Sequence, residues 1–275
     1  MSVQQQPDAN RVRIMGIVNV TPDSFSDGGR FTTEAAISNQ VEAMVAAGAD
    51  IIDVGGESSR PFSRPVPVEE ELARVIPAIT AIRRQHTIPI SIDTTKAAVA
   101  EQALAAGADL INDISALRFD PAMIDLIRAT RVPVVIMHMQ GAPKDMQVDP
   151  QYEDVVAEIS TFFEERLAWA AERGVDRSRF ILDPGIGFGK TVAHNLTILN
   201  NLAAFRGLGC PLLIGHSRKA FIGKILDIET AADRDVATAA ISALCAMNGA
   251  SIIRVHDVAK SRQAVRLAEA IRDAR

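Results

Sequence analysis

Eight short apolar runs, separated by segments with helical periodicity, limit the fold of this chain more than any other feature. Each run is almost continuously apolar, which is typical of a parallel strand buried on both faces under covering helices. The runs are Arg13–Val18, Ile51–Val54, Ile90–Ile92, Leu110–Ile111, Val134–Met137, Phe180–Leu182, Leu212–Ile214 and Ile252–Arg254. Eight strand-then-helix units in 275 residues predict an α/β protein of the (β/α)₈ (TIM) barrel class.

A weak internal repeat supports this interpretation. The chain reads AAGADIID at Ala46–Asp53, AAGADLIND at Ala105–Asp113 and MNGASIIRV at Met247–Val255. In each copy we expect the glycine, Gly48, Gly107 or Gly249, to be the left-handed residue that ends a helix before the next strand. Because no Pro- or Ser-rich linker divides the chain, we expect a flexible tail at residues 1–10 and one barrel domain over residues 11–275.

Composition excludes several classes of partner. The net charge of −5 gives no general attraction to nucleic acid or to an anionic membrane. No apolar run approaches the ~18 residues of a membrane span, and the polar N-terminus lacks the apolar core of a signal peptide. Only two cysteines occur, without metal-like spacing, so we expect a cytoplasmic protein.

Polar residues collect where the predicted strands end, while the strand starts hold nothing comparable. In a (β/α)₈ barrel this C-terminal face carries the active site. Two members, Asp53 and Glu57, could equally hydrogen-bond neighbouring loops, and His138 could be a satisfied core histidine. The full set is Asn19, Asp53, Glu57, Asp93, Asn112, Asp113, His138, Asp183, His216, Ser217, Lys219, Arg254 and His256.

The types of these residues suggest a ligand. Asp93, Asn112 and Asp183 suit a flat heterocycle with several N–H donors, since carboxylates accept bidentately. Lys219, Arg254 and His256, with Arg60 from the second loop, form the basic cluster that an acidic protein needs to hold an anion. Arg254 could also stack on the ring. Asn19 offers a hard oxygen for Mg²⁺.

The glycine-rich segment GIGFGKT at Gly185–Thr191 is not a nucleotide-binding P-loop. The P-loop pattern requires a glycine where this chain has Pro184, and the spacing also fails the dinucleotide fingerprint. We expect these glycines to let the loop pass close to a ligand, with Phe188 as an apolar wall.

The motifs as a set resemble the dihydropteroate synthase family of folate biosynthesis, in family order and over nearly the whole chain. The first and the sixth of them, NVTPDSFSDGG and DPGIGFGK, are highly specific, and the first strand runs directly into NVTPDSFSDGG. The motifs are NVTPDSFSDGG at Asn19–Gly29, GGESSRP at Gly55–Pro61, SIDT at Ser91–Thr94, NDI at Asn112–Ile114, MHMQG at Met137–Gly141, DPGIGFGK at Asp183–Lys190, SRK at Ser217–Lys219 and RVHD at Arg254–Asp257.

The resemblance implies a (β/α)₈ barrel and a transferase reaction. A pterin diphosphate (6-hydroxymethyl-7,8-dihydropterin diphosphate) and p-aminobenzoate would give 7,8-dihydropteroate and pyrophosphate, with Mg²⁺ as cofactor. It also implies a homodimer and an arylamine site that sulfonamides target.

The same resemblance implies roles for individual residues, which are listed here by ligand. The pterin would be bound by Asp93, Asn112, Met137, Asp183, Lys219 and Arg254; the diphosphate by Asn19 (through the metal), Ser59, Arg60, Arg254 and His256; p-aminobenzoate by Phe188, Ser217 and Lys219; and a mobile loop would include Thr21, Pro22, Asp23, Phe25 and Asp27. The predicted catalytic group is Asn19, Asp93, Lys219, Arg254 and His256.

Two positions of the second loop depart from the family. Ser59 stands where the family usually has Thr, and Phe62 where it commonly has Gly. The bulk of Phe62 bears on the conformation of this loop and on the arylamine site beside it.

Two other functions compete with the synthase. A pterin-dependent methyltransferase barrel would serve a corrinoid partner, but it needs neither a pyrophosphate clamp nor an arylamine pocket. A non-catalytic pterin-binding module would have no reason to keep Asn19, Arg254 and His256 together. The chemistry favours a dissociative substitution, because a pterin ring can delocalise charge at its exocyclic methylene and the arylamine is already neutral at pH 7.

Overall fold

Eight parallel strands form the centre of the structure, a computed structural model that describes residues 11–21, 30–58, 63–143 and 145–274. The predicted tail at residues 1–10 lies outside this part of the chain. The strands are β1 (Arg13–Asn19), β2 (Ile51–Gly55), β3 (Ile90–Asp93), β4 (Leu110–Asp113), β5 (Val134–Met137), β6 (Phe180–Asp183), β7 (Leu213–Ile214) and β8 (Ile252–Val255).

The strands close into a barrel. Their order is β6-β5-β4-β3-β2-β1-β8-β7, and each neighbouring pair is parallel. A parallel bridge between Leu182 and Leu212 joins the two ends of this order, and the Leu182 N–H donates to the Pro211 carbonyl at 2.9 Å. The predicted (β/α)₈ barrel is confirmed, and each predicted strand is found with its bounds shifted by at most two residues.

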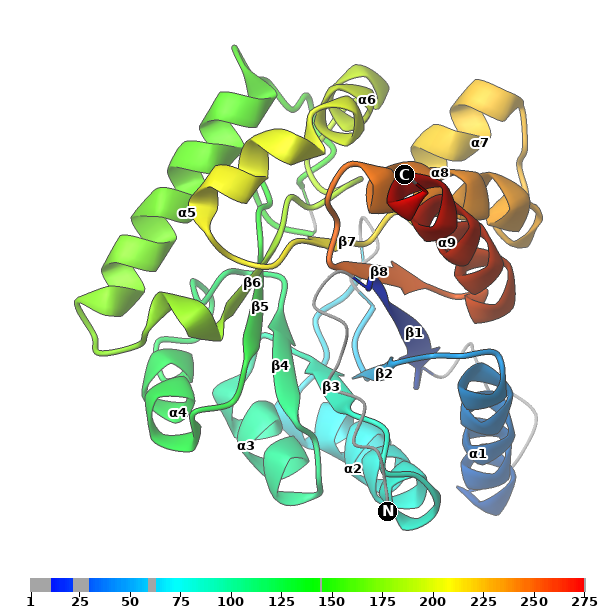
Figure 1. Ribbon diagram of the computed structural model, residues 1–275. Coiled ribbons are helices and arrows are strands. Elements are labelled where there is room, and N and C mark those ends of the chain that lie inside the picture. Colours follow the sequence, from blue (N-terminus) through cyan, green and yellow to red (C-terminus); the bar gives the residue numbers. More distant parts are fainter. Residues whose placement is uncertain (1–10, 22–29, 59–62, 144, 275) are drawn as a thin grey trace.

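Helices surround the strand ring, as Figure 1 shows. They are α1 (Arg30–Ala46), α2 (Val68–Gln85), α3 (Ala97–Ala105), α4 (Met123–Thr130), α5 (Val155–Ala171), α6 (Val192–Asn200), α7 (Ala220–Leu226), α8 (Asp235–Met247) and α9 (Val258–Asp273). Short 3₁₀ helices cover Arg177–Arg179, Leu202–Leu208 and Ala232–Arg234. No helix within the described ranges is long and apolar enough to cross a membrane.

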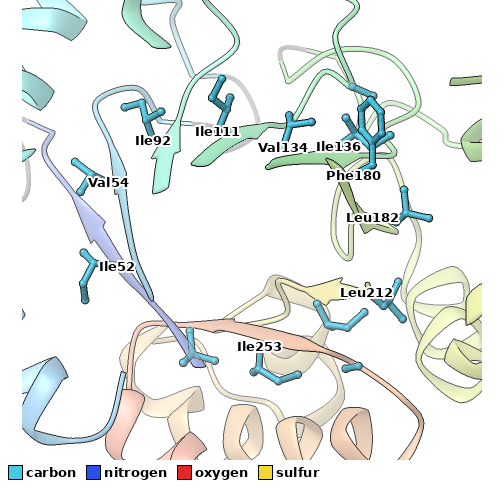
Figure 2. Packing of buried hydrophobic residues seen from close by; sticks show 14 of the residues in the cluster. Ile52, Val54, Ile92, Ile111, Val134, Ile136, Phe180, Leu182, Leu212 and Ile253 are labelled. Carbon is cyan, nitrogen blue, oxygen red and sulfur yellow. The ribbon is translucent and has the colours of Figure 1, made fainter. Parts of the chain in front are cut away.

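Side chains alternate between the two faces of the strand ring. One set points outward and packs under the helices, as Ile52, Val54 and Leu182 do in Figure 2. The other set fills the barrel interior with a separate apolar layer. This inner layer is Met15, Ile51, Leu110, Val135, Ile181, Leu213 and Ile252. Because a strand alternates strictly, the inward residue two positions further along each strand lies directly above this layer.

The repeat glycines end their helices as predicted, and arginines bind two of them. Gly48, Gly107 and Gly249 have φ of 92°, 113° and 95°. Arg83 donates to the Gly107 carbonyl from Nε and Nη2 at 3.1 and 2.8 Å. Arg262 reaches the Gly48 carbonyl in the same way, at 3.0 and 2.7 Å. The repeat therefore encodes a left-handed glycine at the end of each helix, and in two of its copies the carbonyl of that glycine binds a guanidinium.

The aspartate of the repeat ties each strand start to its neighbour. Asp109 Oδ2 accepts from the Ile90 N–H at 2.8 Å and from Arg83 Nη2 at 2.6 Å. Asp50 Oδ2 accepts from the Ile14 N–H at 2.7 Å and also pairs with the guanidinium of a helical arginine. The expectation that strand starts hold nothing comparable is therefore wrong: this face carries charged groups, and their contacts are structural.

We predict that Asp109→Ala lowers the free energy of unfolding by about 1–2 kcal/mol, because the Ile90 N–H and Arg83 both lose their acceptor. Chemical denaturation would measure the change. Glu172→Ala is the control, since that exposed carboxylate makes only a 3.6 Å contact with Arg173 and should change stability by less than about 0.5 kcal/mol. Equal stability of the two variants would contradict this structural role.

Candidate functional site at the C-terminal mouth of the barrel

Polar side chains line the barrel directly above its apolar layer. Asp53 lies two residues beyond Ile51 on β2, and Asn112 two residues beyond Leu110 on β4. Asp183 and Arg254 follow Ile181 and Ile252 by the same step on β6 and β8. The strand alternation therefore aims four polar groups from four strands at one space. This placement agrees with the active-site face of such barrels.

Arg254 links two of the strands through ion pairs. Its Nε donates to Asp53 Oδ2 at 2.6 Å, and its Nη2 donates to Asp93 Oδ2 at 2.7 Å. Burial lowers the pKa of the guanidinium, but attraction to Asp53 and Asp93 outweighs it and leaves the pKa above its usual range. Burial likewise raises the pKa of the Asp93 carboxyl, and Arg254 only partly offsets this shift. Arg254 is therefore a permanent cation held flat between two carboxylates.

Asp53 is the member of this cluster whose importance the sequence did not reveal. It is fully buried, and its Oδ2 also accepts from Asn112 Nδ2 at 3.2 Å. From the sequence, Asp53 and Glu57 could each either belong to the site or hydrogen-bond a neighbouring loop. The structure separates them, because Glu57 pairs with Lys96 behind the mouth while Asp53 contacts two predicted site residues. The alternation of side chains along β2 could have distinguished them, because Asp53 lies two residues after the inward-pointing Ile51.

Asp183 faces the mouth from the opposite side of the ring. Its Oδ1 accepts from the Gly185 N–H at 2.8 Å, and burial raises the pKa of its carboxyl to about 6. Oδ2 lies 3.6 Å from the position that a Cβ on Gly215 would take. The absence of a side chain at residue 215 therefore keeps one carboxylate oxygen accessible within the ring of strands.

Lys219 and Phe188 form one wall of the mouth. The ammonium nitrogen of Lys219 lies 3.9 Å from the centre of the Phe188 ring, a cation–π contact. Burial lowers the pKa of Lys219 to about 8, so that the side chain is still largely protonated at pH 7. Phe188 also belongs to an apolar cluster with Met137, Met139 and Met146. A flat ring could rest on this cluster, since thioether side chains adapt to irregular surfaces.

Ser217 and His256 bond to each other across the ends of β7 and β8. Ser217 Oγ lies 2.9 Å from His256 Nδ1 and accepts from the His256 backbone N–H at 3.2 Å. Burial lowers the pKa of His256 to about 3, helped by Arg218 and Arg254. The imidazole is therefore neutral at pH 7 and can donate one hydrogen bond and accept another. In the basic cluster predicted from the sequence, His256 thus supplies hydrogen bonds and no positive charge at this pH.

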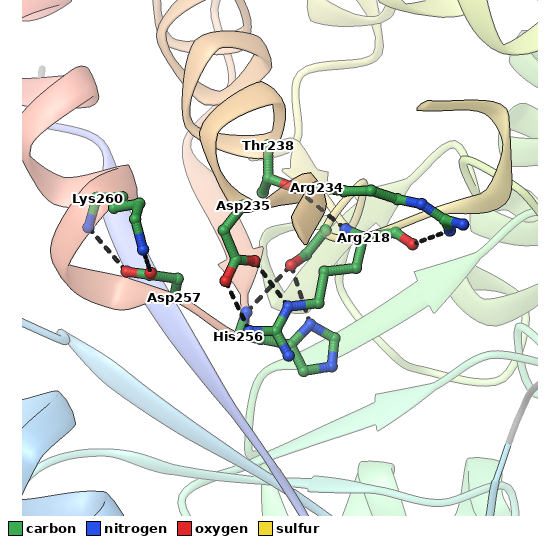
Figure 3. A network of polar contacts seen from close by, with 8 residues as sticks. Arg218, Arg234, Asp235, Thr238, His256, Asp257 and Lys260 are labelled. Atoms are coloured by element: carbon green, nitrogen blue, oxygen red, sulfur yellow. Dashed lines mark hydrogen bonds and ion pairs between the residues drawn. The ribbon is translucent and has the colours of Figure 1, made fainter. Parts of the chain in front are cut away.

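The backbone that carries this pair is held by a second ion pair. Arg218 donates from Nε and Nη2 to the two carboxylate oxygens of Asp235 at 2.7 and 2.8 Å (Figure 3). Its own N–H donates to Thr238 Oγ1 at 3.1 Å. These contacts bind the β7 loop to the start of α8. They fix Ser217 and Lys219 on either side of Arg218.

The loop after Asp183 packs differently from our expectation. Lys190 is buried, and its Nζ lies 2.9 Å from the Phe188 carbonyl and 3.0 Å from His138 Nδ1. A Cβ on Gly185 would lie only 2.0 Å from the His138 carbonyl. The glycine at 185 therefore admits the neighbouring loop and not a ligand, and Lys190 is not a phosphate-binding lysine. His138 is a satisfied core histidine, as the alternative interpretation had it.

Two further polar residues from the sequence set contact only the protein. Asp113 accepts from the N–H groups of Ser115 and Leu117 at 2.7 and 3.0 Å, and thereby shapes the turn after β4. His216 is buried, with Nε2 2.9 Å from the Thr238 carbonyl. Burial lowers the pKa of His216 to about 4, so it is neutral at pH 7. Neither residue needs a ligand to explain its contacts.

Asn19 ends β1, and Gly55 of β2 lies between it and Asp93 of β3. Asn19 Oδ1 and Asp93 Oδ2 lie 3.8 and 3.7 Å from the position of a Cβ built on Gly55, so a side chain at residue 55 would fill the space between them. The half-buried carboxamide oxygen of Asn19 is a hard ligand of the kind that Mg²⁺ accepts, since Mg²⁺ binds few protein ligands and completes its shell with water and phosphate oxygens. Within the described ranges, no three His, Cys, Asp or Glu side chains converge into an alternative metal site.

Several predicted site residues cannot be placed. Thr21 is described and follows β1 closely. The positions that lie outside the described residues are Pro22, Asp23, Phe25, Asp27, Ser59, Arg60 and Phe62. Their predicted roles, and the effect of Phe62 on the second loop, stay predictions.

Several known proteins similar to this chain are named dihydropteroate synthase. The family described as pterin binding enzyme matches residues 15–256. A dihydropteroate synthase of Synechocystis sp. is 46% identical over 261 residues, which cover 95% of this chain and 90% of the relative. That of Escherichia coli K12 is 45% identical over 263 residues, 96% of this chain and 93% of the relative.

Solved structures similar to this chain are also named dihydropteroate synthase. A Yersinia pestis dihydropteroate synthase with a sulfonamide drug complex has a TM-score of 0.91 at 42% identity, covering 98% of this chain and 96% of that one. The Xanthomonas albilineans enzyme with 4-aminobenzoic acid has a TM-score of 0.90 at 46% identity, covering 96% and 94%. The resemblance seen in the sequence is thereby confirmed. The chain belongs to the dihydropteroate synthase family of pterin-binding enzymes.

Proposed function

We propose that this protein condenses 6-hydroxymethyl-7,8-dihydropterin diphosphate with p-aminobenzoate to form 7,8-dihydropteroate and pyrophosphate. The observation that carries the proposal is the polar layer in the barrel mouth, where Asp53, Asp93, Asn112 and Asp183 surround one guanidinium. This set of acceptors suits a ring rich in N–H donors. The relatives that support the proposal are named for this activity, and one of the X. albilineans structures is described as a complex with 7,8-dihydropteroate.

Each ligand has a place that its chemistry favours. The pterin ring would donate to Asn112 and Asp183, rest against Met137 and stack on Arg254. The diphosphate would meet Arg254 and the neutral imidazole of His256 at the ends of β7 and β8. The arylamine would enter along Phe188, with Lys219 and Ser217 at its border. Mg²⁺ held by Asn19 would neutralise part of the diphosphate charge.

The substitution would be dissociative. The bond between the pterin methylene and the diphosphate oxygen breaks first, and both electrons leave with pyrophosphate. The positive charge left on the methylene spreads into the ring, where Asp93 stabilises it electrostatically. The neutral amine of p-aminobenzoate then attacks the methylene and forms the C–N bond, and the resulting ammonium gives its proton to the released pyrophosphate or to water. Since the nucleophile needs no prior deprotonation, the site needs no nucleophile–base pair.

The assay that tests this function measures pyrophosphate release from the pterin diphosphate with Mg²⁺, with and without p-aminobenzoate. Release that requires both substrates, together with dihydropteroate formation, would support the proposal. Pterin binding without release would instead favour a pterin-binding barrel and call for a methyl-transfer assay. Absence of pterin binding would refute the assignment of the barrel mouth.

We predict that Asp93→Ala lowers kcat by about 100-fold or more, because the developing cation loses its counter-charge and Arg254 keeps only Asp53 as partner. Steady-state pyrophosphate release at saturating substrate would measure it, with the thermal unfolding midpoint as a check on folding. Asp125→Ala, which removes an exposed carboxylate on α4, is the control and should retain wild-type activity. A kcat of Asp93→Ala close to the wild-type value would contradict the role assigned to this carboxylate.

A pH profile should report on Lys219. Because burial lowers its pKa to about 8, the ammonium is present at pH 7 and is lost as the pH rises through 8. We therefore expect kcat/KM, which reflects groups of the free enzyme, to fall above pH 8. Lys219→Arg keeps the charge at all these pH values and should remove this alkaline limb, even if its rate is lower. If kcat/KM of the Lys219→Arg variant still falls above pH 8, another group is responsible for the titration.

We infer that the protein is a homodimer joined through α7, α8 and α9. These helices lie side by side on one flank of the barrel in Figure 1. They carry seven of the ten exposed large apolar side chains within the described residues, namely Ile225, Leu226, Val236, Leu244, Met247, Leu267 and Ile271. An apolar area of this kind is typical of a subunit interface, and a second copy is the partner that the family resemblance implies.

Replacing Leu244 by Glu should produce monomers, because a charge placed on this flank would have to be buried on association. Light scattering after size-exclusion chromatography at micromolar concentration would measure the mass. Phe119→Glu is the matched control, since Phe119 is also exposed but lies before α4. A wild-type monomer, or a dimer that Leu244→Glu leaves intact, would contradict this interface.

The cell compartment is inferred from thiol chemistry alone. Cys210 and Cys245 are both free, and burial raises the pKa of each thiol. Such thiols are unreactive and suit a reducing environment. We infer that the protein works in the cytoplasm.

A further inference from the structure

Asp53 makes contacts that folding alone does not explain. Its Oδ2 accepts from Arg254 and Asn112, while its Oδ1 is buried without a hydrogen-bond partner in the described part of the chain. A buried carboxylate with an unpartnered oxygen lowers stability. An apolar residue at position 53 would extend the apolar layer that contains Ile51, and it would leave no buried polar atom without a hydrogen-bond partner. The carboxylate is therefore retained for what it does to its two partners.

The first partner is Asn112, whose amide can point in either of two directions. A carboxylate can only accept hydrogen bonds, so Asn112 must turn its Nδ2 toward Asp53. The reverse orientation would bring Asn112 Oδ1 within about 3.2 Å of Asp53 Oδ2, where two acceptors repel each other. Asp53 therefore forces Asn112 to present its carbonyl oxygen to whatever occupies the mouth.

The second partner is Arg254, which Asp53 holds by Nε. Asp93 holds the same guanidinium by Nη2, from the next strand of the ring. Two carboxylates at two corners fix both the position and the plane of the group. Asp93 lies closer to the mouth than Asp53 does. In the pairing of β2 with β3, Asp93 is opposite Gly55, which is two residues nearer the C-terminal end of β2 than Asp53. Asp53 acts from one layer below.

We propose that Asp53 is a positioning residue that sets the amide direction of Asn112 and the plane of Arg254, and thereby makes the mouth selective for a ring with an N–H donor opposite Asn112. This inference rests on the proposed function, since it names a residue that orients two of the predicted pterin ligands. Asp53 would not touch the pterin itself. Its effect would therefore be confined to pterin affinity and to steps that use Arg254.

The test is the affinity for 6-hydroxymethylpterin, a ring without a leaving group, measured by titration calorimetry. Asp53→Asn keeps the shape but loses the charge and can donate to Asn112, which frees the amide to reverse. We expect the Kd to rise about 10-fold, because an N–H donor of the ring would then face the Nδ2 donor of Asn112 and stay unpaired. The Kd for p-aminobenzoate should change less than about twofold. Asp109→Asn, which weakens an Asp–Arg pair at the opposite face, is the matched control and should bind the pterin normally.

A double-mutant cycle separates positioning from a general loss of structure. If Asp53 acts partly through Asn112, then Asp53→Asn and Asn112→Ala should be non-additive, and the double variant should lose less binding free energy than the sum of the two single losses. Fully additive effects, or an Asp53→Asn variant with wild-type pterin affinity, would overturn the inference while leaving the proposed function intact. A wild-type protein that binds no pterin would refute both.

Discussion

The strict alternation of side chains along parallel strands is the constraint on which the site depends. In a closed ring of strands, every second residue points inward, and two steps along a strand separate one interior layer from the next. Here the lower layer is apolar and the upper layer carries Asp53, Asn112, Asp183 and Arg254. A register shift of one residue would send all four outward beneath the helices. The fold and the site are therefore specified by the same pairing of strands.

Placing three carboxylates above an apolar layer raises an electrostatic difficulty. Burial raises the pKa of Asp93 and Asp183, so ionising them opposes folding at neutral pH. Arg254 and Lys219 reduce this penalty, and both are also suited to the ligands. The folded state binds protons at these carboxyls more readily than the unfolded chain does, so their contribution to stability falls as the pH rises from about 4 to about 7.

The sequence predicted the fold closely because the relevant signals are local. Short apolar runs define strands, and a glycine after a helix marks its end, so both could be found without knowing any contact. The contacts of Asp53 and Glu57 could not be distinguished in this way. Both are acidic residues within or just after β2, and only the inward direction of residue 53 brings it to Arg254, 201 positions away in the chain. Likewise, Asp50 and Asp109 read as ordinary turn residues until the arginines of α9 and α2 are seen beside them.

In the glycine-rich loop, the rejection of a P-loop was correct, but the explanation for the glycines needs correction at Gly185. The sequence excluded a P-loop, yet the glycines were expected to make room for a ligand. In the structure Gly185 makes room for the His138 carbonyl, and Lys190 binds the Phe188 carbonyl from behind. Lys190 therefore helps to fix the backbone of Phe188, the residue that we propose as a wall of the arylamine site, while Lys219 contacts the Phe188 ring. Lys190 is buried and Lys219 is only half-buried, so Lys219 is the lysine of the two that could meet a substrate.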